Sequence, residues 1–384
     1  MKHSKTKQDR RIYIYIDVPV FKYQINQIFP KKLKHIKNLI FINTSELNFK
    51  KDQLMKHYKN VSKKEVPANT IFIKKFENFR ILAKKIKSSD IFIFYNYSFS
   101  LKNSKFPFLE IFNEIKCKKI LMEQHSWISP NFKKNILFNS LRLLRFLVNK
   151  IINKNNNRKI KTDYILSYGE QLKNKFVNYN AKHLDYPSFW IKFYSKLPPK
   201  KFITYVDETF HYSGDQFLTQ KNHKKKIDNL NNYLIKLNHF FSLVEKKFKC
   251  KIVICCKKKF NYNKNYFNGR KIIYGKTLEY ISKSKLVIGH KSEALIQAIY
   301  SKSPVILLRS REFSLKRNLE INSKSINWFN KKSIFFEDYY NKKKKLDVSV
   351  DKKYYSKILN NYFISNNLIK MNFHEKLNLD LKSL

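Results

Sequence analysis

The sequence predicts an α/β protein made of two tandem Rossmann-like, doubly wound domains with a cleft between them. Short apolar runs rich in Ile, Val, Phe and Tyr alternate with longer segments in which apolar residues recur at helical spacing. This alternation occurs in both halves of the chain and is typical of parallel sheets covered by helices on both faces. A chain of 384 residues also exceeds one ordinary hydrophobic core. We expect one domain at 1–195, a second at 200–330 and a helical tail at 331–384.

The short apolar runs of the first half are expected as strands, because each is β-prone and polar segments separate it from the next. They lie at 12–16, 38–42, 70–73, 90–95, 118–122 and 163–167. Ligands of parallel sheets bind beyond the carboxyl ends of the strands. Asp17, Tyr97 and the loop 123–127 follow such runs, so they are the first candidates for a site in this half.

A proline-containing stretch separates the two series of strands. Pro187, Pro198 and Pro199 disfavour continued helix, and we place the linker between the domains there. A long helix is expected beyond it, over 224–249. The strands of the second half are expected at 202–206, 251–256, 271–274, 286–289 and 305–308.

The stretch 285–308 is predicted to form a strand, a tight loop, a helix and a second strand. Gly289, His290 and Ser292 lie in the loop, and Glu293 begins the helix. The free N–H groups and positive dipole end of a helix N-terminus favour a bound phosphate. A βαβ turn that binds no ligand can have the same residues, so both interpretations stay open.

His125 and Asp17 are the candidates for general base catalysis. His125 follows a predicted strand, and near neutral pH a histidine can accept a proton or donate a hydrogen bond to a sugar or phosphate. Asp17 ends the first strand, and its carboxylate can deprotonate a hydroxyl group. A structural histidine and a helix N-cap are the competing interpretations of these two residues.

Two polar segments of the second half are candidates for ligand binding. Gly214 and Asp215 lie in a polar loop whose N–H groups can face a phosphate, although a plain surface loop fits equally well. Tyr274 and Gly275 end a predicted strand and can frame a nucleobase or ribose.

The net charge of +52 is compatible with a polyanionic partner. Yet Lys, Asn, Ile, Phe and Tyr are abundant while Gly and Pro are scarce, which is the bias of an AT-rich genome. We therefore do not expect a specific nucleic-acid partner. The four cysteines lack the spacing of a zinc site, and no D-x-D motif occurs, so no metal site is predicted. The fingerprints of P-loop NTPases, NAD enzymes, esterases and zinc proteases are also absent from the sequence.

Residues 129–153, which begin at Ser129 and end at Asn153, are predicted to form a long basic amphipathic helix. Such a helix can lie on an anionic membrane surface with its aliphatic side chains in the interface. A helix that packs on the core and exposes a basic face explains the same residues. No apolar run reaches the roughly 18 residues of a membrane span. We expect a cytoplasmic protein, with the inner-membrane surface as its peripheral partner.

Together these residues resemble the motifs of bacterial GT-B glycosyltransferases of surface-carbohydrate and capsule biosynthesis. In the second half, the resemblance rests on 272–275, 278–281 and 286–304. In the first half, it rests on 124–125 and on the turn 168–170.

The resemblance implies that the first domain binds an acceptor and the second domain a nucleotide-activated sugar. The expected acceptor-binding residues are Tyr97, Glu123 and Gln124. The expected donor-binding residues are Gly214, Asp215, Tyr274, Gly275, His290, Ser292 and Glu293. Gly289 and Gln297 stand where retaining members often carry glutamates, which leaves the stereochemistry and the catalytic base open.

The function that the resemblance implies is metal-independent transfer of a sugar to a glycan or lipid-linked acceptor. The nucleotide sugar would be a co-substrate, and no further cofactor is expected. A nucleotide-sugar epimerase and a polyol-phosphate transferase share the same two-domain plan and stay open as alternatives. A nucleic-acid-binding protein that uses the +52 charge is the contrasting class.

Overall fold

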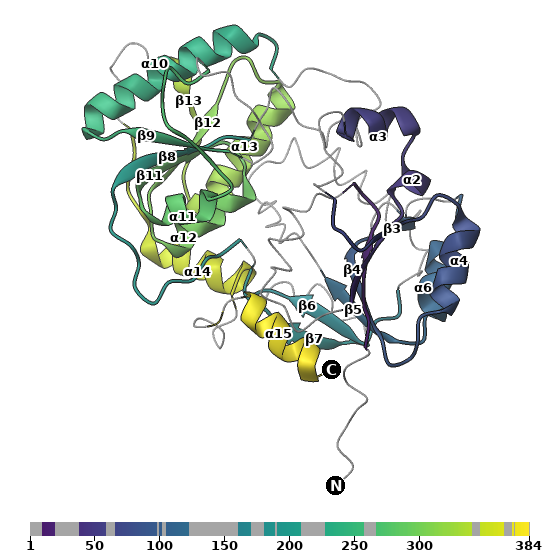
Figure 1. The fold of residues 1–384 in the computed structure, drawn as a ribbon. Coiled ribbons are helices and arrows are strands. Elements are labelled where there is room, and N and C mark those ends of the chain that lie inside the picture. The colour runs from purple at the N-terminus through teal and green to yellow at the C-terminus, as the bar shows by residue number, and fades with distance from the viewer. Residues whose placement is uncertain are drawn as a thin grey trace, which may run out of the picture. The chain divides into compact units, whose positions relative to one another are not determined.

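The structure is a computed structural model, in which the chain forms two parallel α/β sheets, of seven and six strands (Figure 1). It describes residues 10–19, 38–58, 66–97, 100–101, 105–122, 160–169, 180–188, 190–208, 227–256, 266–339, 346–364, 371 and 373–383. The predicted fold class, two doubly wound parallel α/β sheets in tandem, is confirmed.

Each sheet belongs to a compact unit of its own. The first unit comprises Met1–Tyr186 together with Leu377–Leu384, and the second comprises Pro187–Lys376. The end of the chain therefore returns to the first unit. The domain limits expected from the sequence, at 195, 200 and 331, stay predictions.

The first sheet is ordered β3-β2-β1-β4-β5-β6-β7, so the order of its strands reverses between β1 and β4. The strands are β1 (Ile12–Ile16), β2 (Leu39–Asn43), β3 (Thr70–Phe72), β4 (Ile91–Asn96), β5 (Lys118–Met122), β6 (Tyr164–Ser167) and β7 (Lys182–Asp185). The sequence did not predict β7, because this edge strand is half exposed and carries Lys182 and Asp185 in place of an apolar run.

The core of the first unit is largely aromatic. Its helices are α2 (Ser45–Asn48), α3 (Lys51–Tyr58), α4 (Phe76–Lys84), α6 (Phe108–Glu114) and, from Leu377 on, α15 (Phe373–Ser383). The ring of Tyr15 on β1 lies 4.8 Å from that of Phe112 on α6 and 5.7 Å from that of Phe79 on α4. The Tyr186 hydroxyl donates to Asp380 Oδ2 at 2.8 Å, which fixes α15 to the first unit.

The second sheet is ordered β10-β9-β8-β11-β12-β13, and its order reverses between β8 and β11. The strands are β8 (Phe202–Val206), β9 (Ile252–Cys256), β10 (Ile272–Tyr274), β11 (Ser284–Gly289), β12 (Val305–Arg309) and β13 (Ile334–Phe335). All but the two-residue β13 were predicted. Its helical elements are α10 (Leu230–Phe248), α11 (Thr277–Ser282), η4 (Glu293–Leu295), α12 (Ile296–Tyr300), α13 (Leu315–Phe329), η5 (Phe336–Tyr339) and α14 (Lys352–Tyr362).

Helices lie on both sides of the second sheet, with α10 on one side and α11 and α12 on the other (Figure 1). Helix α10 begins later than the predicted 224–249, because Asn229 caps it by accepting from the Asn232 N–H at 3.0 Å. It ends where Lys249 adopts the left-handed conformation. Tyr233, Leu237 and other apolar residues of one face are buried, so burial of this face holds the helix on the sheet.

The segment around the predicted linker is bound to the second unit. The side-chain amide of Gln297 accepts from the Lys192 N–H at 2.7 Å and donates to the Lys192 carbonyl at 3.1 Å. The Lys200 ammonium donates to Ser282 O at 2.9 Å and to Ser303 Oγ at 2.7 Å. Burial lowers the pKa of Lys200 to about 8. The fully buried Gln297 thus binds the backbone of the linker segment at Lys192.

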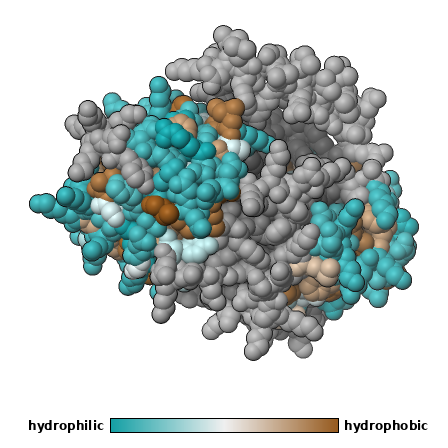
Figure 2. Space-filling view, turned by 90° about the horizontal axis from the view of Figure 1, so that it is seen from above, coloured by the Kyte–Doolittle hydropathy of each residue, from teal (hydrophilic) through white to brown (hydrophobic). Residues whose placement is uncertain are grey.

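The visible described surface is mostly hydrophilic, with isolated hydrophobic patches (Figure 2). Among the exposed apolar side chains, Leu315 on α13 is 75% exposed and Ile235 on α10 is 68% exposed. In the ranges that the structure describes, no helix is both long enough and apolar enough to cross a membrane. The amphipathic segment predicted at 129–153 lies outside these ranges.

Candidate functional site

The candidate site lies at the carboxyl end of the second sheet, where the strand order reverses. Glu208 follows β8 closely, and the loop of His290, Lys291 and Ser292 follows β11. Because β8 and β11 are neighbours whose connections run in opposite directions, their carboxyl ends form the switch point of this sheet. Ligands of doubly wound sheets bind at such points.

His290 anchors the loop from inside the core. Its Nδ1 lies 2.6 Å from the Leu308 carbonyl oxygen, which can only accept, so Nδ1 carries the proton. Its Nε2 is the acceptor, and the hydroxyls of Tyr205, at 3.0 Å, and Tyr233, at 2.9 Å, share its single lone pair while lying 3.3 Å from each other. Burial lowers the pKa of His290 to about 4, against the opposing effect of the Glu208 carboxylate. The imidazole is therefore neutral near pH 7, and any role in donor binding would be indirect, through the loop it holds.

Glu208 joins three elements of the site. One carboxylate oxygen accepts a short hydrogen bond from the Lys291 backbone N–H. The other lies 3.7 Å from the guanidinium of Arg317, which α13 contributes. Burial lowers the pKa of Arg317, and the Glu208 carboxylate opposes this shift. Glu208 therefore ties the ends of β8 and β11 to the helix that follows β12.

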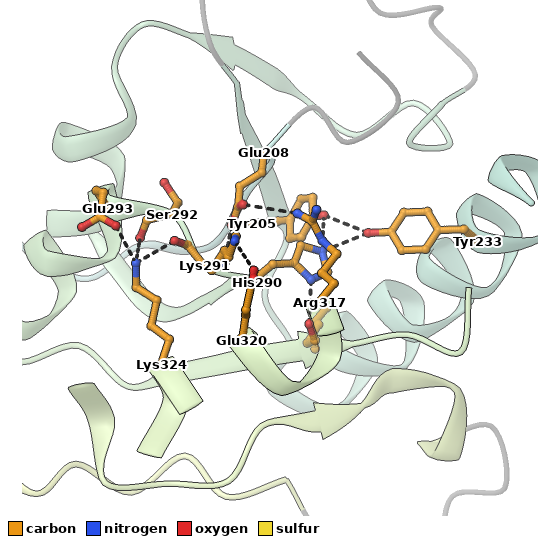
Figure 3. A network of polar contacts seen from close by, with 11 residues as sticks. Tyr205, Glu208, Tyr233, His290, Lys291, Ser292, Glu293, Arg317, Glu320 and Lys324 are labelled. Atoms are coloured by element: carbon orange, nitrogen blue, oxygen red, sulfur yellow. Dashed lines mark hydrogen bonds and ion pairs between the residues drawn. The ribbon is translucent and has the colours of Figure 1, made fainter. Parts of the chain in front are cut away.

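Lys324, also on α13, fixes the loop from the opposite side (Figure 3). Its ammonium donates to the carbonyl of Lys291 at 2.6 Å, to the carbonyl of Ser292 at 3.3 Å and to Glu293 Oε1 at 3.1 Å. It also lies 3.6 Å from the centre of the Trp328 ring. Burial lowers the pKa of Lys324, and the Glu293 carboxylate opposes this most strongly. The ammonium thus has partners on all of its donor positions.

Lys291 makes the third ion pair of the site. Its ammonium lies 2.5 Å from Glu320 Oε2, and the two side chains are 38% and 41% exposed. The side chains of Arg317 and Lys324 are only 11% exposed. We call this group the switch-point cluster; it consists of Glu208, Lys291, Glu293, Arg317, Glu320 and Lys324. In the cluster each cation has one carboxylate partner, and the Lys291 pair faces solvent most.

Ser292 and Glu293 belong to this cluster region, and they begin a helical segment that ends at Tyr300, but its first turn is not α-helical. It starts with the 3₁₀ turn η4 and continues as the five-residue α12. Ser292 is the N-cap, and its hydroxyl accepts from the Ala294 N–H at 3.3 Å. Because this helix is short, its dipole is small, and the charged side chains of α13 contribute most to the electrostatic potential at the loop before η4.

Tyr274 and Gly275 do not join this cluster, because β9 and β8 separate β10 from β11 in the sheet. Tyr274 is 37% exposed, and Gly275 has a φ of 69° in the left-handed region. The Gly275 N–H donates to the Cys256 carbonyl at 3.2 Å, so the turn fixes the end of β10. A role for these two residues in binding a nucleobase stays a prediction.

Asp17 and Tyr97 lie where the order of the first sheet reverses, after β1 and β4. Asp17 is fully buried, and its Oδ2 accepts from the Ser100 N–H at 2.9 Å. The Tyr15 hydroxyl bonds to Ser100 Oγ at 2.5 Å and to Thr44 Oγ1 at 2.7 Å. Asp17 thus fixes the segment after β4 from within. Its action as a base and its role as a cap of the segment that follows it both stay predictions.

The other predicted site residues lie outside the described ranges. They are Glu123, Gln124, His125, Gly214 and Asp215. Across the residues that the structure describes, no three or more His, Cys, Asp or Glu side chains are grouped to hold a metal ion.

Most of the switch-point cluster was not predicted from the sequence. Glu208 had a usable signal, because it follows a predicted strand almost directly. Arg317, Glu320 and Lys324 recur at helical spacing on α13, which is a signal for one helix face but not for the surface that the face meets. Only the fold shows that this face covers the loop after β11.

Comparisons with known proteins gave structural likenesses only. No protein-family model and no curated protein matches the chain. UDP-GlcNAc 2-epimerase from Methanocaldococcus jannaschii is 12% identical at a TM-score of 0.43, covering 91% of this chain and 98% of its own. A structure of the wall teichoic acid polymerase TagF is 13% identical at 0.46, covering 98% and 88%. The Anabaena protein HepE, in complex with UDP and glucose, is 8% identical at 0.39, covering 98% and 100%. At these TM-scores the likenesses carry no argument about activity.

Proposed function

We propose that the protein is a nucleotide-sugar-dependent enzyme of the GT-B type, and that it is a glycosyltransferase acting on a surface-glycan or lipid-linked acceptor. The observation that supports this proposal is the position of the switch-point cluster. Residues from β8, β11 and α13 bring cations and carboxylates together at the carboxyl edge of a doubly wound sheet. This is where such sheets bind phosphorylated nucleotides.

In the proposed reaction, the donor phosphate lies against the exposed ammonium of Lys291. A charge-assisted contact of this kind stabilises the negative charge that grows on the leaving nucleotide. Arg317 and Lys324 support the site indirectly, because they hold Glu208, Ser292 and the Lys291 backbone in place. The base that activates the acceptor hydroxyl would be Asp17 or His125. Both residues belong to the first unit.

Turnover with a panel of nucleotide sugars tests the proposal. Purified protein is incubated with UDP-, GDP-, ADP- and CMP-sugars, with and without lipid extract as acceptor, and the products are identified by mass spectrometry. A transferase releases the nucleotide and adds the mass of the sugar to an acceptor, whereas an epimerase conserves the mass of the nucleotide sugar. The proposal fails if no nucleotide sugar is converted and none raises the thermal midpoint of unfolding.

Contact with the inner membrane belongs to the same proposal, because a lipid-linked acceptor lies there. We assign this contact to 129–153, on the basis of its basic amphipathic sequence. Co-sedimentation with phosphatidylglycerol vesicles, but not with phosphatidylcholine vesicles, is the expected result. Deletion of 129–153 should abolish it, and equal sedimentation with both lipids would contradict the assignment.

A further inference from the structure

The Lys291–Glu320 pair differs from the other two pairs of the switch-point cluster in its freedom to change partners. The Lys324 ammonium donates hydrogen bonds to two backbone carbonyls and to Glu293. The Arg317 side chain is mostly buried beside Glu208. Separating either of these pairs would leave a buried charge without compensation. Lys291 and Glu320 are well exposed, and exposed ion pairs contribute little to stability.

The backbone of Lys291 is held on both sides (Figure 3). Its N–H donates to Glu208, and its carbonyl accepts from Lys324. The Lys291 side chain can therefore move from one anion to another while the loop stays in place. A lysine ammonium is a compact charge on a flexible stem, which suits such an exchange.

We propose that Glu320 is a placeholder for the phosphate of the bound ligand. In the ligand-free protein, its carboxylate holds the Lys291 ammonium at the end of β11. The diphosphate group of a nucleotide, which carries more negative charge in total than a carboxylate, displaces Glu320 and takes over Lys291. This inference rests on the proposed function, because it requires a phosphorylated ligand at this edge of the sheet.

The placeholder role predicts opposite effects for the two partners. Glu320→Gln removes the competing anion, so nucleotide binding should become about 2- to 5-fold tighter, as expected from the small strength of an exposed ion pair. Lys291→Met removes a charge-assisted contact to phosphate, so binding should weaken about 10-fold. In the double variant Lys291→Met/Glu320→Gln, the gain should disappear, because Glu320 acts only through Lys291.

A matched control is available on α11. Glu279 pairs with Lys283 at 2.6 Å and more distantly with Lys192 at 3.7 Å, and the side chains of Glu279 and Lys283 are 30% and 33% exposed. Glu279→Gln therefore makes the same change in net charge at a similar surface pair outside the switch-point cluster. It separates displacement at Lys291 from a general electrostatic attraction of nucleotides.

The test is isothermal titration of the 384-residue protein and the four variants with UDP, GDP, ADP, CMP and inorganic pyrophosphate. Tighter binding by Glu320→Gln alone, weaker binding by Lys291→Met and no gain in the double variant support the proposal. Unchanged or weaker binding by Glu320→Gln, or an equal gain from Glu279→Gln, overturns the placeholder while the proposed function stands. If no probe binds to the wild type or to any variant, both proposals are overturned.

Discussion

His290 should make the second unit sensitive to acid well above the pH at which its carboxylates protonate. The imidazole is fully buried in the neutral form, between the Leu308 carbonyl and the hydroxyls of Tyr205 and Tyr233. A proton on Nε2 would abolish the acceptor that these hydroxyls use. We therefore expect His290→Gln, which cannot titrate in this range, to remove a defined part of the pH dependence of unfolding.

The sign and size of the effect follow from the pKa values. The pKa of His290 falls from 6.5 in the unfolded chain to about 4 in the fold. The unfolded state therefore binds the proton more readily between these values, and stability is lost as the pH falls through them. Relative to pH 7.5, the loss is about 2 kcal/mol at pH 5 and about 3 kcal/mol at pH 4, taking 1.36 kcal/mol per pKa unit.

Urea unfolding followed by tryptophan fluorescence between pH 7.5 and 4.5 measures this loss in a Trp127→Phe background, since the two remaining tryptophans, Trp190 and Trp328, both belong to the second unit. The variant will be less stable at pH 7.5, because the Leu308 carbonyl loses its partner. The informative quantity is the difference in stability between wild type and His290→Gln, which should shrink by about 2 kcal/mol on going to pH 5. His239→Gln, at an exposed position on α10, should keep the full pH dependence of the wild type.

A parallel loss of stability by His290→Gln and the wild type between pH 7.5 and 5 would contradict this prediction. In that case the imidazole would have to titrate equally in the folded and unfolded states. A parallel loss would also remove the basis for a neutral imidazole that orders the loop.

Three further changes test the packing of the second unit by the same urea assay. Gln297→Glu places a carboxylate at a fully buried position and removes the donor to the Lys192 carbonyl, so it should destabilise by about 2–4 kcal/mol. The control for the same exchange is Gln53→Glu on α3 of the first unit, where the side-chain oxygen accepts from the Lys50 N–H at 2.9 Å; a carboxylate keeps this contact, so stability should change little. Asn229→Ala removes the cap of α10 and should cost about 1 kcal/mol; no loss would argue against the cap. The pKa of Lys200 is lowered to about 8, so the stability of the wild type relative to Lys200→Met should rise between pH 8 and pH 10. A constant difference over that range would contradict the burial of the ammonium.

The fold was predictable because its strands are short, apolar and separated by helical segments. The exceptions are strands whose environment differs: β7 is a polar edge strand, and β13 is only two residues long. Edge strands need not carry an apolar run, since they are not buried on both faces. Helix type at Glu293 was also beyond the sequence, because η4 and α12 are set by the tight connection between β11 and β12.

The candidate site was predictable in location but not in its contacts. Gly289 and Ser292 marked the loop, since small residues after a strand indicate a tight turn. The sequence could not show that His290 points into the core, because its partners Tyr205 and Tyr233 are distant along the chain. Pairing of Lys291 with Glu320 likewise depends on how α13 packs over the loop.

The return of α15 to the first unit has a consequence for the order in which the protein is made. A chain is synthesised from its N-terminus, and domains generally fold as units as they emerge. Tyr186 of the first unit can meet Asp380 only after the intervening residues, which include the whole second unit, have been synthesised. The second unit has therefore been synthesised almost completely before the first can acquire its last helix.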